Sequence, residues 1–222
     1  MVERFRKLYA DLMTPGARLA IALRMTPDMV TWFGTLLVIV AALVMVPRGW
    51  LWQAALVITF CVLTDGVDGQ MARMTGQGSS YGAFLDSTLD RVADGAIFGA
   101  VALYYAGLGN SVLWAGVAIG ALVMGQVTSY AKARGLALGF KVWGGLAARG
   151  DRLLALLVGM LLAGLGLHWA LPVALVYLLC ASSFTVLQRM GQVKQQAVEA
   201  EAAGITVVDP QATVAAEHQK KP

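Results

Sequence analysis

The stretch GWLWQAALVITFCVLTDGVDGQMAR (residues 49–73) joins an apolar run to two carboxylates, Asp65 and Asp68. No charged residue occurs between positions 49 and 64, so this run suits the interior of a lipid bilayer. A charged side chain inside such a segment is costly and by default marks a functional site. The stretch therefore predicts a membrane helix that ends in a polar site.

The composition of the whole chain also indicates a membrane protein. Of its 222 residues, 58% are hydrophobic and 14% are charged, whereas a soluble domain has roughly a quarter charged residues. The two cysteines lie in apolar runs and the two histidines are far apart, which argues against a disulfide framework and a zinc site. The net charge of +4 is concentrated beside apolar segments, which favours a membrane surface over nucleic acid as its partner.

The apolar runs predict an all-α fold, a bundle of six transmembrane helices. The charge-free ranges 95–131 and 153–188 are each long enough for two spans divided by a turn. Two further spans precede the first of these ranges, and the helix that begins near residue 83 leads into it. The predicted spans are approximately 28–46, 50–74, 83–105, 111–134, 151–166 and 168–190.

Basic residues flank these predicted spans unevenly. With six crossings, almost all of them fall on one face of the membrane, and the opposite face holds only Arg48. Cytoplasmic loops carry the excess of lysine and arginine in membrane proteins. We therefore expect both termini and the acidic motif on the cytoplasmic side of a multi-pass membrane protein.

Composition divides the chain into three parts. Residues 1–25 are too charged for a signal-peptide core and predict an amphipathic juxtamembrane helix that lies in the headgroup region. Residues 26–192 form the predicted transmembrane domain. Residues 193–222 are rich in Ala, Gln and Glu with little apolar periodicity, which predicts a disordered cytoplasmic tail.

A second pair of carboxylates, Asp86 and Asp90, follows the first pair after the short loop TGQGSSYG. The members of each pair are three or four residues apart and so share one face of a helix. Four carboxylates brought together at two adjacent helix ends could not all stay ionised unaided. Hard oxygen ligands suit Mg²⁺ or Mn²⁺. The four aspartates therefore predict a site for two divalent cations, Mg²⁺ first and Mn²⁺ as its substitute.

The motifs DGVDGQMAR (65–73) and GAFLDSTLD (82–90) together resemble the signature of the CDP-alcohol phosphotransferase family. That signature is D-x-x-D-G-x-x-A-R, eight residues, then G-x-x-x-D-x-x-x-D, and no fixed position departs from it here. The family displaces CMP from a CDP-linked lipid by an acceptor hydroxyl, using metal ions. The resemblance implies CDP-diacylglycerol as one substrate, a six-span architecture and a homodimer.

The resemblance also implies a role for individual residues. Asp65, Asp68, Asp86 and Asp90 would ligate metal, and Asp90 would also be the general base towards the acceptor hydroxyl. Contacts to CDP-diacylglycerol would come from Asp28, Thr31, Gly69, Arg73 and Ser79. For the stretch PDMVT (27–31), a helix N-cap is the alternative explanation.

Cations in SYAKARG (129–135) and ARGDR (148–152) are predicted at the same membrane depth as the aspartates. Such a group suits an acceptor that already carries a phosphate. Together with DRVADGA (90–96), these motifs resemble bacterial phosphatidylinositol phosphate synthases, particularly the actinobacterial type. The resemblance implies inositol 1-phosphate as acceptor, release of CMP and a place in the bacterial plasma membrane. The implied ligands of the acceptor phosphate are Lys132, Arg134 and Arg152, with Arg189 as a further candidate.

Other functions stay open at this point. A phosphatidylglycerophosphate synthase performs the same chemistry on glycerol 3-phosphate, which is equally a phosphorylated acceptor. A divalent-cation transporter would line a permeation path with the aspartates, but transport favours acids near the bilayer midplane and these are predicted at one end. A non-catalytic membrane scaffold would not need the intact motif.

Overall fold

The computed structural model describes residues 13–64, 66–76, 78–146 and 148–202, and within these ranges the chain contains helices and no β-strand. The predicted all-α fold is therefore confirmed for this part of the chain. A helix over residues 13–22 precedes α2. The later helices are α2 (Pro27–Met45), α3 (Leu51–Thr64), α4 (Gly66–Thr75), α5 (Ser80–Ala106), α6 (Val112–Ala137), α7 (Arg149–Gly164) and α8 (Ala170–Ala202).

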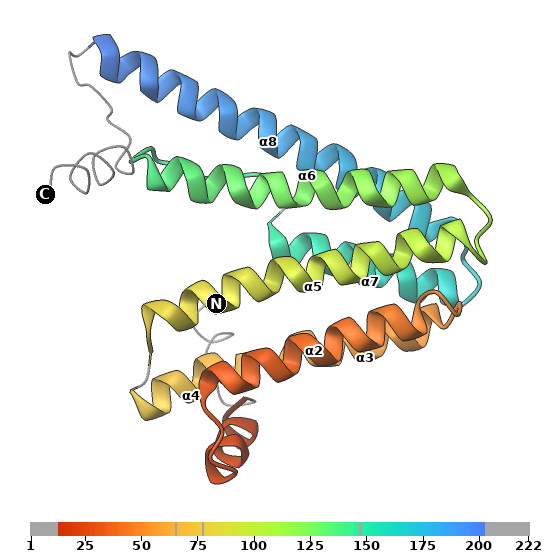
Figure 1. Ribbon diagram of the computed structural model, residues 1–222. Coiled ribbons are helices and arrows are strands. Elements are labelled where there is room, and N and C mark those ends of the chain that lie inside the picture. Colours follow the sequence, from red (N-terminus) through yellow and green to blue (C-terminus); the bar gives the residue numbers. More distant parts are fainter. Residues whose placement is uncertain (1–12, 65, 77, 147, 203–222) are drawn as a thin grey trace, which may run out of the picture.

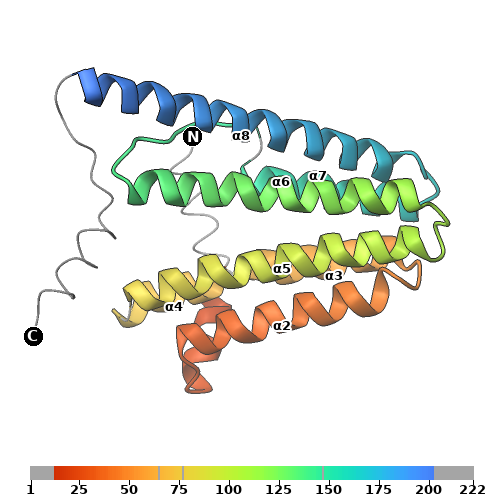
Figure 2. The ribbon, with the colours of Figure 1, turned by 45° about the horizontal axis from the view of Figure 1, so that its top comes forward.

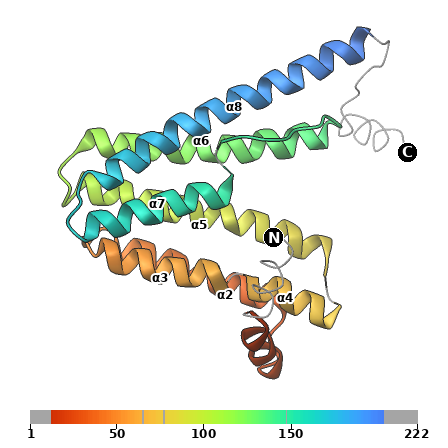
Figure 3. The same ribbon diagram turned by 180° about the vertical axis from the view of Figure 1, so that it is seen from behind.

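The long helices lie side by side in one bundle (Figure 1). Helix α2 packs on α3 and α5, α5 packs on α6, and α6 packs on α8. Seen from behind, α7 lies between α3 and α8 (Figure 3). The α2–α3, α5–α6 and α7–α8 turns gather at one end of the bundle, whereas α4 and the first turns of α5 lie at the other end. The two acidic motifs therefore meet at one end, as their spacing predicts.

The apolar residues are arranged for a lipid environment. The centre of the bundle is filled with small and aliphatic side chains such as Ala54, Ile97 and Leu175. Large apolar side chains face outward; Phe60 is 68% exposed and Leu113 is 71% exposed. In water such a surface would drive aggregation, but lipid tails are as apolar as these side chains.

Within the described part of the chain, four helical stretches are long and apolar enough to cross a membrane: Pro27–Met45, Leu51–Thr75, Val112–Ala137 and Ala170–Ala202. Helix α5 has 27 residues, but its first half carries the charged residues of the second acidic motif. Helix α7 has 16 residues, which is short for a span of about 20. The chain is thus a helical membrane protein in which four of the six predicted spans meet this criterion.

The helix over residues 13–22 packs against α4. Met13, Ala17 and Ala20 are buried against Val67 and Met71, and their spacing of four and three residues puts them on one helix face. This small cluster holds α4 beside the start of α2. Residues 1–12, which make up half of the predicted juxtamembrane helix, lie outside the described residues.

Helix α8 continues beyond the predicted membrane domain and projects past α6 (Figure 2). Residues 193–202, predicted to be disordered, are helical in the structure. Polar contacts explain the difference. Gln196 accepts a hydrogen bond from the backbone N–H of Lys141 (2.9 Å) and donates one to its carbonyl (2.8 Å). Gln192 makes the same pair of bonds with Trp143. Residues 203–222 lie outside the described part of the chain.

Candidate active site

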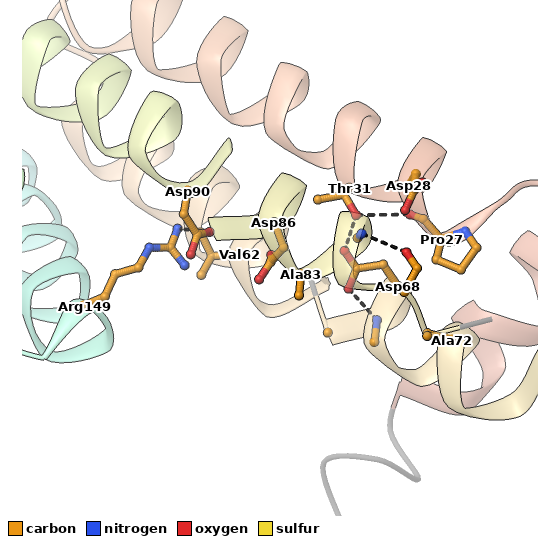
Figure 4. Close-up of a pocket in the computed structure, with 15 residues that line it drawn as sticks. Pro27, Asp28, Thr31, Val62, Asp68, Ala72, Ala83, Asp86, Asp90 and Arg149 are labelled. Atoms are coloured by element: carbon orange, nitrogen blue, oxygen red, sulfur yellow. Dashed lines mark hydrogen bonds and ion pairs between the residues drawn. The ribbon is translucent and has the colours of Figure 1, made fainter. Parts of the chain in front are cut away.

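A cavity of about 480 Å³ opens between α2, α4 and α5, at the end of the bundle where the acidic motifs meet (Figure 4). We call it the aspartate cavity. Its lining consists of small residues, mostly glycine and alanine, and of polar side chains from four helices and the loop before α5. The polar side chains are Asp28, Thr31, Asp68, Ser79, Asp86, Asp90 and Arg149.

The carboxylates reach the cavity from three different helices. Asp28 lies in the first turn of α2 and Asp68 in the first turn of α4, while Asp86 and Asp90 occupy successive turns of α5. In Figure 4 the side chains of Asp90, Asp86 and Asp68 follow one another along the cavity. The predicted convergence of these three residues on one cavity is therefore present. Asp65 lies outside the described residues.

Asp68 is held by two hydrogen-bond donors. One is the hydroxyl of Thr31 on α2, and the other is the backbone N–H of Gly69. The Thr31 hydroxyl also lies 3.1 Å from the carbonyl oxygen of Pro27, but it has one proton and its contact with Asp68 is the shorter. A charge-assisted bond is the stronger of the two kinds, so Thr31 ties α2 to α4 through Asp68.

The start of α5 approaches the start of α2 closely. Ser79 caps α5 by accepting a hydrogen bond from the N–H of Gly82 (2.9 Å). A Cβ on Gly82 would lie 3.3 Å from an Asp28 carboxylate oxygen and 3.2 Å from the Ser79 hydroxyl. Around Gly69, by contrast, there is open space within 4 Å of where a Cβ would be. Glycine thus permits the close helix approach at Gly82 and leaves the cavity wall bare at Gly69.

Asp90 faces a cation that the sequence prediction did not assign to the site. Arg149, the first residue of α7, places its Nη2 atom 2.7 Å from Asp90 Oδ1. Arg91 lies further off, with 3.8 Å between its Nη2 and Asp90 Oδ2. Arg149 precedes Arg152 by three residues and so shares its helix face. That spacing was the signal that could have placed Arg149 beside the aspartates.

The four cations predicted for the acceptor phosphate occupy different surroundings, and none of them lines the aspartate cavity. Arg152 is buried and donates to the Ser129 hydroxyl at 3.5 Å. Arg189 donates to the backbone carbonyls of Thr128 and Gly144. Arg134 and Arg189 line a second cavity of about 450 Å³ between α6 and α8, and Lys132 is exposed.

The remaining predicted lipid contact, Arg73, also lies away from the cavity lining. It is exposed in the last turn of α4, whereas Asp28, Thr31, Gly69 and Ser79 all line the aspartate cavity. The N-cap of α2 is Thr26, which lies just before residues 27–31 and accepts a hydrogen bond from the N–H of Met29. Asp28 and Thr31 themselves point to the cavity.

The donor groups of the cavity fit a divalent cation in kind, because carboxylate oxygens are the ligands that Mg²⁺ and Mn²⁺ prefer. Among the residues that the structure describes, however, no group of three His, Cys, Asp or Glu residues is close enough to hold a metal ion by itself. Asp68 and Asp90 are engaged with Thr31 and Arg149, respectively. To bind a metal ion, Asp68 and Asp90 would have to exchange these partners for the metal and move closer to the other carboxylates.

The fold and the cavity define the class of protein: a helical membrane protein with an acid-lined site at one end of its bundle. The family model for CDP-alcohol phosphatidyltransferase matches residues 24–187. The chain belongs to this family and is therefore a transferase that makes phospholipid, as its two acidic motifs indicate.

Curated relatives narrow the comparison. The chain is 49% identical to the phosphatidylinositol phosphate synthase of Cutibacterium acnes, over 88% of this chain and 98% of that protein. It is 46% identical to the phosphatidylinositol phosphate synthase of Streptomyces avermitilis, over 89% and 84% of the two chains. The resemblance to the actinobacterial synthases is therefore confirmed.

Solved structures agree with the fold. The crystal structure of Mycobacterium tuberculosis phosphatidylinositol phosphate synthase with CDP-DAG bound superposes with a TM-score of 0.79 at 37% identity, and covers 82% of this chain and 94% of that chain. A second crystal structure of the same enzyme, in complex with manganese and citrate, gives a TM-score of 0.76 at 37% identity over 82% and 88% of the chains.

Proposed function

We propose that this chain is a phosphatidylinositol phosphate synthase, which transfers the phosphatidyl group of CDP-diacylglycerol to inositol 1-phosphate and releases CMP. The observation that carries the proposal is the aspartate cavity, where Asp68, Asp86 and Asp90 meet Thr31 and Ser79. The same cavity lies in a chain that matches one synthase of this name over 98% of that protein's length. Its opening among helices with apolar outer faces suits one soluble and one lipid substrate.

Two divalent cations, Mg²⁺ or in its place Mn²⁺, are proposed to be held by Asp65, Asp68, Asp86 and Asp90. The manganese in the Mycobacterium tuberculosis structure supports a divalent cation. When bound, such ions neutralise the charge that develops on the leaving CMP.

Asp90 is proposed as the general base. Its carboxylate is 16% exposed, so it is sheltered from water but reachable from the cavity. It would take the proton of the acceptor hydroxyl once that oxygen is within hydrogen-bond reach. The acceptor oxygen forms a bond to the phosphorus of the phosphatidyl group, and the bond from this phosphorus to the CMP oxygen breaks. CMP leaves with the electron pair of that bond.

CDP-diacylglycerol is proposed to contact Asp28, Thr31, Gly69, Arg73 and Ser79. Four of these five residues line the cavity, and Arg73 would reach it from the exposed end of α4. The CDP-DAG complex of the Mycobacterium tuberculosis enzyme supports a lipid-nucleotide site in this fold.

The acceptor phosphate is proposed to bind cations beside the aspartate cavity, from the set Lys132, Arg134, Arg152 and Arg189. Arg152 is the best placed of these, because it lies one turn along α7 from the cavity residue Arg149. The burial of Arg152 means that a bound anion would meet a poorly hydrated cation, which strengthens the attraction.

The proposed membrane arrangement has six helices that span a bacterial plasma membrane, with residues 26–192 as the transferase domain. Both termini and the active site are proposed to face the cytoplasm, with residues 1–25 as a surface helix and residues 193–222 as a cytoplasmic tail. A homodimer is supported by Gly95 and Gly99 on α5, because nothing lies within 4 Å of where a Cβ at either would be. Such open small-residue faces permit close packing between membrane helices.

The test is CMP release by the purified protein with CDP-diacylglycerol and Mg²⁺, offering each acceptor in turn. Release that requires inositol 1-phosphate supports the proposal, and treatment with EDTA should abolish it until Mg²⁺ or Mn²⁺ is returned. Release with glycerol 3-phosphate alone would move the enzyme to phosphatidylglycerophosphate synthesis. No release with any acceptor would overturn the proposal and favour a cation transporter.

A further inference from the structure

Asp94 lies one turn beyond Asp90 on α5 and is buried, with 6% of its surface exposed. It stands outside the signature motifs, which end at Asp90. A buried carboxylate is costly unless cations surround it. Asp94 therefore needs partners, and the structure supplies three of them.

Three arginines surround the Asp94 carboxylate, and we call them the arginine cluster. Arg149 Nε lies 3.5 Å from Asp94 Oδ1, and Arg91 Nη1 lies 3.5 Å from Oδ2. Arg152 Nη2 lies 3.8 Å from Oδ2. Ser129 on α6 accepts hydrogen bonds from Arg91 and Arg152. The carboxylate of Asp94 thus joins α5 to the first turn of α7.

Arg149 connects this cluster to the aspartate cavity. Its Nη2 end is on Asp90 and its Nε side is on Asp94, so one guanidinium spans two successive turns of α5. The Nε atom is buried and makes no hydrogen bond, because its contact with Asp94 is an ion pair of poor hydrogen-bond geometry. Asp94 therefore fixes the position of Arg149 while leaving this donor available to a closer acceptor.

The charges indicate what that acceptor is. The three arginines carry +3, and Asp90 and Asp94 together carry −2. If Asp90 engages the reacting groups in the cavity, then of these two carboxylates only Asp94 still pairs with the three arginines. The net charge of the arginines and Asp94 is then +2. A phosphate monoester carries about −1.5 to −2 at pH 7, which would balance it.

We propose that Asp94 is a positioning residue that holds Arg149 at the cavity wall for the phosphate of the acceptor. This inference rests on the proposed function, because it takes a phosphorylated alcohol as the second substrate. Asp94 acts through Arg149 and does not touch the substrate itself. Removal of its charge should therefore affect the acceptor and leave the CDP-lipid almost unaffected.

The first experiment compares steady-state kinetics of the wild type and Asp94→Asn in the full-length protein. The expected result is a KM for inositol 1-phosphate raised by roughly 10-fold to 100-fold, as for a displaced binding group, with the KM for CDP-diacylglycerol within about two-fold of wild type. A variant that only lost folded protein would lower the apparent kcat and leave both KM values unchanged, which would overturn the proposal. Asp151→Asn is the matched control, because Asp151 is exposed on the first turn of α7.

A double-mutant cycle with Arg149→Gln tests whether Asp94 acts through that arginine. Independent residues multiply their effects within about two-fold, whereas residues of one network do not. The acceptor KM of the double variant should fall short of the product of the two single effects by more than about two-fold. If the rise in acceptor KM of the double variant equals the product of the two single rises within about two-fold, Asp94 acts independently of Arg149 and the proposal is overturned.

Removal of a buried charge can prevent folding, so a second variant keeps the test decisive. The pair Arg91→Gln/Asp94→Asn removes one charge of each sign and leaves the net charge of the cluster unchanged. The same rise in acceptor KM is expected from it, because Arg149 still loses its anchor; an unchanged acceptor KM would overturn the proposal.

If the wild type proves to use glycerol 3-phosphate, the proposed acceptor is wrong and the same cycle is measured with that substrate. An effect confined to the KM for glycerol 3-phosphate then supports the role of Asp94, and its absence overturns it.

Discussion

The aspartate cavity and the arginine cluster lie one helical turn apart on α5, yet they differ in how they are built. The cavity carboxylates Asp68 and Asp86 are partly or fully open to the space between the helices. The cations of the cluster, by contrast, are gathered around Asp94, which is buried with Arg152. The aspartate cavity exposes its carboxylates to incoming ligands, whereas the arginine cluster pairs its cations with a buried carboxylate.

This difference indicates how the two substrates would be handled. Open carboxylates can exchange their partners for metal ions, since Asp68 gives up only the Thr31 hydroxyl and the Gly69 N–H. Asp94 is proposed to keep Arg149 in place for a phosphate, because a buried carboxylate and the cations around it hold one another in position. The two regions meet at Asp90 and Arg149, where the proposed general base and the proposed phosphate-binding cation form an ion pair of 2.7 Å.

The largest effect should come from the residue shared by both regions. Asp90→Asn keeps the shape of the side chain but removes the proton acceptor and one proposed metal ligand, so CMP release should fall by about 10³-fold or more. Binding of CDP-diacylglycerol to the purified variant should stay within several-fold of wild type, because Asp90 is proposed to contact the acceptor. Wild-type rates in this variant would remove Asp90 from the chemistry.

The next effect separates the arginine cluster from the aspartate cavity. Arg152→Ala should raise the KM for inositol 1-phosphate by roughly 10-fold, because a buried charge-assisted contact to phosphate is lost. The KM for CDP-diacylglycerol should change much less. Arg48 belongs to the turn between α2 and α3, which lies at the end of the bundle opposite the cavity, so Arg48→Ala is the control and should alter neither value. Equal effects of Arg152→Ala on both substrates would assign it to the fold and not to the acceptor.

The two regions also differ in how well the sequence predicted them. The aspartate cavity was predictable because its motifs are close in sequence and their three- and four-residue spacings fix one helix face. Asp28 and Thr31 could be added by resemblance to a known family, and both do line the cavity.

The arginine cluster was harder to predict because its two halves, Arg91 with Asp94 on α5 and Arg149 with Arg152 on α7, are brought together by tertiary packing. Arg91 and Arg149 are 58 positions apart in the sequence, and both form an ion pair with Asp94. No sequence pattern predicts that Arg189 donates to the backbone carbonyls of Thr128 and Gly144. Disorder was predicted from residue 193 onward, but α8 continues to Ala202. Periodicity detects apolar helix faces, whereas Gln196 supports this part of α8 by hydrogen bonds to the backbone of Lys141.

A smaller effect is expected from the hydrogen bond that Thr31 donates to the cavity carboxylate Asp68. Thr31→Val replaces the hydroxyl with a methyl group of similar size and so leaves Asp68 without its donor from α2. A hydrogen bond to a charged group contributes about 1.5–3 kcal/mol, and Asp68 keeps its second donor, the Gly69 N–H, so we expect the low end of this range and a fall in kcat/KM of roughly 10-fold. Thr31→Ser keeps the hydroxyl and should stay within about three-fold of wild type. If Thr31→Val matched wild type, the position of Asp68 would not depend on α2.

The smallest effect lies furthest from both regions, where α8 supports the segment that leads from α6 to Arg149. Gln196→Ala removes two hydrogen bonds to the backbone of Lys141, but Gln196 is half-buried, so water replaces part of their contribution. We expect a loss of about 1 kcal/mol in unfolding free energy, measured in detergent, with CMP release nearly unchanged. Gln195→Ala is the matched control, because the Gln195 side chain bonds Glu199 on the exposed face of α8. A large fall in activity with Gln196→Ala alone would show that the α6–α7 connection sets the position of Arg149, and the arginine cluster would then depend on α8 as well as on Asp94.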